Sequence, residues 1–129
     1  MAVTHPAAFR TTVADLVTTT LSTTAKLKFR LTGTAAAPGT AVATLSLPNP
    51  VFGAATAGVT AACTTATSDT NATGNASPVA TATLETGGGT VVVHCAVAAS
   101  GSDINMSGGL TIGAGDTVAC SSLTYTAMP

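Results

Sequence analysis

Charged and aromatic side chains are scarce in this chain of 129 residues. Charged residues make up 7% of it, the net charge at pH 7 is −1, tryptophan is absent, tyrosine occurs once and phenylalanine three times. This charge balance excludes a strongly basic nucleic-acid-binding protein and an acidic tail. It also provides little repulsion between copies, so we expect the protein to associate with itself or with a partner.

Long hydrophobic runs are missing as well. The longest, such as residues 91–93, are far shorter than the roughly 20 residues that a membrane-spanning helix requires, and we expect no membrane partner. The first residues contain no charged leader followed by an apolar stretch, so we also expect no signal peptide.

Large apolar side chains are few. Leu, Ile, Val and Phe together form about a fifth of the chain, close to the composition of disordered proteins, but disorder also requires a high net charge. The length suits one domain. We therefore predict a folded chain with a lean core, whose small margin of stability would grow through burial at subunit contacts.

One segment, from His5 to Leu21, has the hydrophobic periodicity of a helix. Its apolar residues recur at i, i+4, i+7 and i+8, which places them on one side of a helix. We predict that residues 1–24 form an N-terminal helical arm. The predicted packing face of this helix consists of Phe9, Val13, Leu16 and Val17.

After residue 25 the periodicity changes to the two-residue alternation of β-strands. Turns rich in Gly and Pro separate the strands, and one hairpin is joined across residues 86–89. The helices that a parallel sheet requires between its strands are not indicated. We therefore predict a mainly β fold, in which residues 25–129 form an antiparallel β-sandwich or jelly roll. The predicted strands are 26–31, 41–47, 58–67, 79–85, 90–98, 104–106, 110–112 and 117–126.

Three of the four cationic side chains occupy alternate positions of the first predicted strand, at Lys26, Lys28 and Arg30. Alternate residues of a strand point to the same face. One interpretation is a solvated strand that is protected from unwanted pairing. The other is a strip that docks on an acidic partner surface, and these three residues are the candidate strip.

Three cysteines, Cys63, Cys95 and Cys120, each lie on a predicted strand. None has the close spacing of a zinc-binding pair. We expect them to be small buried hydrophobic side chains. A Cys95–Cys120 or a Cys63–Cys120 disulfide is the alternative.

Residue types that carry catalysis occur only as isolated side chains. His5 and His94 have no acidic neighbour in the sequence, and no Gly-x-Ser-x-Gly motif supplies a nucleophile. Residues 69–75 match the first half of a calcium-binding EF-hand loop, but position 12 is Ala80 rather than glutamate, which favours a polar turn. We therefore expect no catalytic, cofactor-binding or metal-binding residues, no cofactor and no enzymatic activity.

Three parts of the chain carry a resemblance to a known group of proteins. They are residues 2–10 (AVTHPAAFR), residues 43–55 with their NPVFGAA end, and residues 112–125, from IGAGDTV to SSLTY. In these parts the chain resembles the small Ala/Thr-rich structural proteins of tailed-bacteriophage virions. The resemblance implies a β-rich, non-enzymatic virion component, although the three cysteines depart from what is expected of such proteins.

The function that we predict from these observations is that of a capsid decoration, or cement, protein. Such a protein would be synthesised in the host cytoplasm and would bind the capsid exterior as a dimer or trimer, with the major capsid protein as its partner and without direct contact to nucleic acid. Binding that is repeated over a lattice gains avidity from many weak contacts. The alternatives are a tail or baseplate component and a receptor- or glycan-binding module of a tail fibre.

Overall fold

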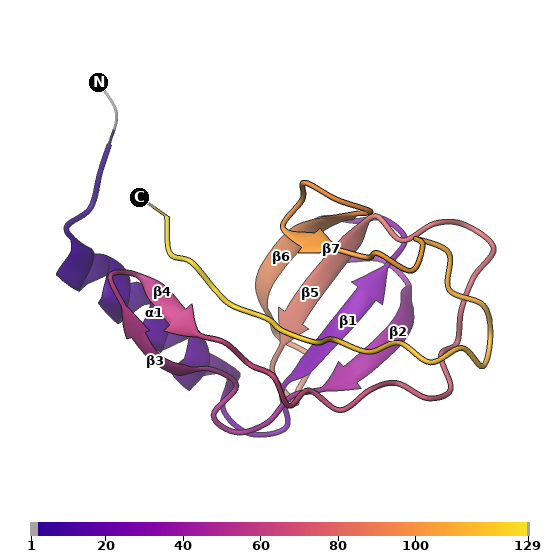
Figure 1. Ribbon diagram of the computed structural model, residues 1–129, viewed down its shortest axis with the longest axis horizontal. Helices are drawn as coiled ribbons and strands as arrows, with labels where there is room; N and C mark the ends of the chain where they lie inside the picture. Colours follow the sequence, from indigo (N-terminus) through magenta and orange to yellow (C-terminus); the bar gives the residue numbers. More distant parts are fainter. Residues whose placement is uncertain (1–2, 129) are drawn as a thin grey trace.

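The computed structural model describes residues 3–128. Met1, Ala2 and Pro129, which belong to the predicted arm, the resembling N-terminal segment and the predicted β domain, lie outside the described residues. The chain is mainly β-structure, with 31% strand and 12% helix, and consists of a short N-terminal helix and a curled mixed sheet. Figure 1 shows the helix with a small hairpin at one end of the molecule and the sheet at the other.

The main sheet has five strands in the order β2-β1-β5-β6-β7. The first four pair antiparallel, and β5 and β6 form the predicted hairpin. β7 instead runs parallel to the end of β6, so the prediction of a purely antiparallel sheet is wrong at this strand. The carboxylate of Asp103 accepts the N–H of Ala96 at 2.9 Å and thereby holds the loop after β6 alongside that strand. The strands are β1 (Lys26–Arg30), β2 (Ala41–Ser46), β5 (Thr81–Glu85), β6 (Val91–Ala98) and β7 (Ile104–Asn105).

The sheet has an apolar face, which β1 illustrates. Leu27 and Phe29 are buried on that face, and Leu27 is in register with Leu45 of β2 on one side and Leu84 of β5 on the other. Side chains in such a cross-strand row contact each other directly. The alternation of apolar and cationic residues that predicted this strand is therefore confirmed as the alternation of buried core and opposite face.

Two further segments, Gly58 to Val79 and Leu110 to Ala127, run antiparallel to each other, with colours from magenta-pink to salmon and from orange to yellow in Figure 1. The first is bonded along the edge of β2, where Thr67 donates its N–H to the Ser46 carbonyl at 2.8 Å, and the second crosses the apolar face of the sheet. They are bonded at both ends, because Ala127 donates its N–H to Gly58 at 2.8 Å and Val79 donates to Leu110 at 2.8 Å. We call this pair of segments the ribbon.

The ribbon is irregular, and this corrects three predicted strands. The predicted strand 58–67 is a strand only over Val59–Ala61, and beyond it Cys63 and Thr67 make isolated bridges. Residues 117–126 make only isolated bridges, at Val118, Leu123 and Thr126, and residues 110–112 form no strand. Turns and bulges interrupt the ladder, since the polar loops rich in Gly, Asn and Asp that lie within both segments favour turns over extended pairing. The alternation of small and polar residues predicted the extended path but not the breaks in it.

Helix α1 is held to the hairpin of β3 and β4 largely through the hairpin's backbone. The side chain of Thr11 accepts the N–H of Gly58 at 3.1 Å, and the carboxylate of Asp15 accepts that of Ala55 at 2.9 Å. The predicted helix is confirmed, whereas β3 was not predicted from the sequence. The elements are α1 (Ala7–Leu21), β3 (Gly53–Thr56) and β4 (Val59–Ala61).

The predicted packing face of α1 is wrong for two of its four residues. Phe9 is 51% exposed and Leu16 is 59% exposed, whereas the fully buried helix residues are Ala14 and Leu21. The polar bonds to the hairpin and the small size of Ala14 let the helix approach the hairpin on this neighbouring side, which turns the more apolar side outward. The other members of the predicted face, Val13 and Val17, are half-buried.

Gly74 provides a test of how tightly the ribbon closes. Its φ is +69°, and a Cβ there would lie 2.3 Å from the backbone nitrogen of Ala114. Gly101 has nearly the same φ, +68°, with no atom within 4 Å of a Cβ. We expect Gly101→Ala to cost only the left-handed conformation, about 1 kcal/mol. Gly74→Ala should cost at least about 2 kcal/mol, because the steric clash is added.

Urea unfolding of both variants and the wild type measures this difference. Equal losses of unfolding free energy in the two variants would contradict the close approach of the two ribbon segments.

Candidate functional site

A charged cluster lies on the polar face of the main sheet, on the two neighbouring strands β1 and β5. Arg30 Nη2 lies 2.6 Å from Glu85 Oε2, and Lys28 Nζ lies 3.3 Å from Glu85 Oε1. The hydroxyl of Thr83 donates to Glu85 at 2.5 Å and accepts from Arg30 Nε at 3.1 Å. We call Lys28, Arg30, Thr83 and Glu85 the charge cluster.

The antiparallel register of β1 and β5 builds this cluster. Lys28 is directly opposite Thr83, and Lys26 is opposite Glu85, so residues two apart on each strand meet on the same face. Arg30 also donates to the carbonyl of Gly39. The groups that bond the carboxylate therefore come from β1 and β5, and the loop at Gly39 holds the guanidinium of Arg30.

The cluster sets the protonation of its one acid. Burial alone would raise the pKa of Glu85, but hydrogen bonds from Thr83, Arg30 and Lys28, together with the charge of Lys28, outweigh it and lower the pKa below its ordinary value. Glu85 is thus an anion in the folded state and compensates cationic charge on this face.

The candidate docking strip does not present three free cations. Arg30 is buried and bonded to Glu85, so it cannot contact a partner surface as the strip would require. Lys28 is shared with the same carboxylate, and Lys26 donates to the hydroxyl of Ser46 at 2.8 Å. The physical reason is the acid on the adjacent strand, which the sequence of β1 alone does not reveal.

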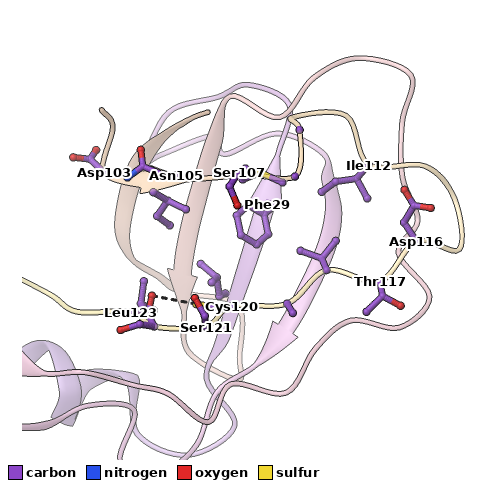
Figure 2. A pocket seen from close by; sticks show the side chains of 18 of the residues that line it. Phe29, Asp103, Asn105, Ser107, Ile112, Asp116, Thr117, Cys120, Ser121 and Leu123 are labelled. Carbon is purple, nitrogen blue, oxygen red and sulfur yellow. Dashed lines mark hydrogen bonds between the residues drawn. The ribbon is translucent and has the colours of Figure 1, made fainter. Parts of the chain in front are cut away.

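A cavity of about 480 Å³ lies between the apolar face and the ribbon. Figure 2 shows the ring of Phe29 at its centre, with Ile112 and Cys120 from the ribbon around it and Ser107 from the loop after β7 beside it. Leu27 also lines it. Apolar side chains therefore form its floor, whereas most of its exposed lining is polar and includes hydroxyl groups of Ser and Thr residues.

The two carboxylates at the rim of this cavity do not converge. Asp103 accepts the N–H of Ala96 at 2.9 Å, and Asp116 accepts that of Gly113 at 2.7 Å. Figure 2 shows them near opposite ends of the lining. The cavity lining holds no histidine beside a hydroxyl or thiol, so it supplies no nucleophile–base pair.

The three cysteines are free thiols. Burial raises the pKa of Cys95 to about 11, and the negative charge of Asp103 makes a smaller contribution to this increase. Burial also raises the pKa of Cys120; a backbone hydrogen bond with Ser122 opposes this increase, and the nearby Cys63 adds to it. Thiols with raised pKa values are poor nucleophiles and poor metal ligands.

The two histidines lie apart, as their isolation in the sequence suggests. His5 is near the ring of Phe9, with ring centroids 5.1 Å apart. His94 lies on β6, opposite Thr83 of β5, and its Nε2 is buried without a hydrogen-bond partner among residues 3–128. Among residues 3–128, neither histidine makes a hydrogen bond to a hydroxyl group, and the hydroxyl of Thr83 donates to Glu85 instead.

The EF-hand-like loop, residues 69–75, uses its first acid to accept hydrogen bonds from backbone N–H groups. The carboxylate of Asp69 accepts the N–H of Thr44 at 2.9 Å and that of Asn71 at 3.0 Å. It therefore joins the ribbon to β2, as a turn residue does. In the part of the chain that the structure describes, no group of three His, Cys, Asp or Glu side chains is placed to hold a metal ion.

The helix and the C-terminal tail form an apolar surface that the sequence did not predict as exposed. Besides Phe9 and Leu16, Met128 is 76% exposed. A hollow of about 130 Å³ lies between helix and tail, and Arg10 fixes the tail there by donating to the carbonyls of residues 127 and 128 at 3.2 Å. We call the exposed side chains of Phe9, Leu16 and Met128, together with this hollow, the helix–tail surface. The hollow is lined by His5, Phe9, Arg10, Val13, Tyr125, Ala127 and Met128.

Comparison with known proteins finds no match to this chain, whether a family model, a curated protein or a solved structure. Among the described residues, no helix has the length and apolar character that crossing a bilayer demands.

The charge cluster predicts a specific pH dependence. The folded pKa of Glu85 is below its unfolded value, so its contribution to stability is complete above the unfolded pKa and is lost as the pH falls through the folded pKa. Glu85→Gln should remove this acid-side loss. At neutral pH it should also lower the unfolding free energy by about 3 kcal/mol, because Arg30 stays buried without its counter-charge.

Denaturant unfolding between pH 7 and pH 3 measures both effects. Lys26→Gln is the matched control, since Lys26 bonds only Ser46, and we expect a change within about 0.5 kcal/mol. An unchanged pH profile in Glu85→Gln would contradict the assignment.

Alkylation tests the environment of Cys95. A thiol with a pKa of about 11 has about 100-fold less thiolate at pH 8 than an ordinary cysteine. Iodoacetamide should therefore modify Cys95 slowly in the folded protein and rapidly in denaturant, as peptide mass spectrometry would show. Equal rates in the two states would contradict this burial.

Proposed function

We propose that this chain is a non-enzymatic structural component of a bacteriophage virion, and specifically a decoration protein that binds the outside of the capsid. The observation that carries the proposal is the helix–tail surface, where Phe9 and Leu16 are more than half exposed on a chain with 7% charged residues. Two large apolar side chains on the outer side of one helix are typical of a surface that a partner covers.

The proposed partner is the major capsid protein. An apolar helix face suits a hydrophobic groove on a large neighbouring protein, where residues spaced i and i+7 act as anchors. No charged side chain separates Phe9 from Leu16 on the outer side, so contact would require little desolvation of charge. Repetition of a weak contact over the lattice supplies the avidity that each contact lacks.

The proposed fold is a distorted β-sandwich, with the main sheet as one layer and the ribbon as the other. Its support is the pairing within the ribbon and the burial of Phe29 between the two layers. Two layers that are closed by long-range pairing would make a stiff block, which suits a protein that bridges capsomers and acts without chemistry.

The test uses heads of the encoding phage that lack this protein. The wild-type chain should sediment with such heads, and Phe9→Ser with Leu16→Ser should weaken binding more than about 10-fold, because each apolar burial is worth about 1.5–3 kcal/mol. Thr12→Ser, also exposed on the helix, is the matched control. Circular dichroism should report the same fold for all three proteins.

Quantitation of intact virions separates the alternatives. A copy number in proportion to capsomers supports decoration, whereas a few copies confined to the tail would favour the tail or baseplate component. Binding of a glycan by the purified chain, at the cavity with Phe29 and its hydroxyl rim, would favour the receptor-binding module instead.

A further inference from the structure

A histidine lies beside one anchor of the proposed capsid contact. His5 lines the hollow between helix and tail, and its imidazole ring is tilted by 56° against the phenyl ring of Phe9, with the ring centroids 5.1 Å apart. Both residues are exposed in the free chain. A partner surface that covers Phe9 therefore also covers the imidazole beside it.

The surroundings of His5 supply positive charge and no acid. Arg10 lines the same hollow, where its guanidinium donates to two carbonyls of the tail. Within residues 3–128, neither Arg10 nor His5 forms an ion pair, and the two ion pairs of this part of the chain both belong to Glu85. The one acid of α1, Asp15, accepts a backbone N–H of the hairpin. A second cation at the hollow would therefore lack a counter-charge from this chain.

The remaining side chains of the hollow are uncharged at neutral and mildly acidic pH. Four of them are apolar and the fifth is a phenol, which keeps its proton throughout this range. They are Phe9, Val13, Tyr125, Ala127 and Met128. Among the described residues of the hollow, the imidazole is thus the one side chain whose charge changes between pH 5 and pH 8.

We propose that His5 makes the capsid contact sensitive to pH, because the helix–tail surface binds its partner only while this imidazole is neutral. The inference rests on the proposed function and names how that contact is regulated. Protonation would place an imidazolium next to Phe9 and Arg10, and the hydrophobic groove of the partner would have to bury it unpaired. The complex therefore excludes the protonated form, and binding weakens as the pH falls through the range in which the imidazole gains its proton.

The second histidine of the chain provides the comparison. His94 lies on β6 of the main sheet, opposite Thr83, and it is not among the residues that line the hollow. A pH effect that came from His94 would act through the sheet rather than through the contact. Ordinary carboxyl groups gain their protons mostly below pH 5, so a comparison of pH 7.5 with pH 5.5 leaves them charged.

Sedimentation with heads that lack this protein, at pH 7.5 and at pH 5.5, tests the proposal. The wild-type chain should bind about 10-fold more weakly at pH 5.5, as exclusion of the protonated form of an ordinary imidazole requires. His5→Gln should bind with similar strength at both pH values, and His5→Lys should bind weakly at both, because its charge is permanent in this range. His94→Gln is the matched control and should retain the wild-type pH dependence. Circular dichroism at both pH values should report the same fold for all four proteins.

The possible results separate this inference from the proposed function. A wild type that binds equally at the two pH values, or a His5→Gln variant that keeps the pH dependence, would overturn the pH sensitivity and leave the capsid contact in place. Tighter binding of the wild type at pH 5.5 would also overturn it, because the partner would then supply an acid to the imidazolium. Loss of the pH dependence in His94→Gln would assign the effect to the sheet and overturn the role of His5. A wild type that sediments with heads at neither pH would instead overturn the proposed function, and the pH sensitivity with it.

Discussion

The ion pair between Arg30 and Glu85 is the constraint on which the main sheet depends. A buried pair of this kind contributes little net stability, because removing two charges from water offsets most of their attraction. Its effect is on specificity. If β5 slipped by one residue along β1, the carboxylate would move to the apolar face and Leu84 to the polar face. The pair therefore fixes the register on which the row of Leu27, Leu45 and Leu84 relies.

The lean core makes this fixed register important. The main sheet has one apolar face, and the ribbon that covers it contributes few large side chains around Phe29. Hydrogen bonds to carboxylates therefore hold many of the elements together. Asp69 links the ribbon to β2, Asp15 links helix and hairpin, and Asp103 holds β7 beside β6. Most of the few acids in the chain thus bond to backbone N–H groups, and the surface is left with little charge.

Local pattern in the sequence predicted the elements whose own residues determine them. The alternation through β1, the hairpin of β5 and β6 and the extent of α1 each follow from periodicity that tertiary contacts did not override. The mainly β composition of the fold follows from the same patterns.

The remainder required information from distant residues. The partner of Arg30 lies 55 positions along the chain, and the breaks in the ribbon depend on loops that meet only in the folded state. The outward orientation of Phe9 follows from the hydrogen bond between Asp15 and Ala55, which hydrophobic periodicity does not reveal. The alternating Thr81, Thr83 and Glu85 could have indicated a polar face opposite the cations, but only once the strands were known to be neighbours.

The ribbon has a consequence for biosynthesis. β1, β2, β5 and β6 are all complete by residue 98, so these strands can pair while the chain is still being translated. The segment that covers Phe29 begins only at Leu110, and a nascent chain therefore exposes the apolar side of its sheet until residues 110–127 have left the ribosome. Chaperones that recognise exposed apolar surface would have their opportunity to bind in this interval, and truncation near the C-terminus would prolong it.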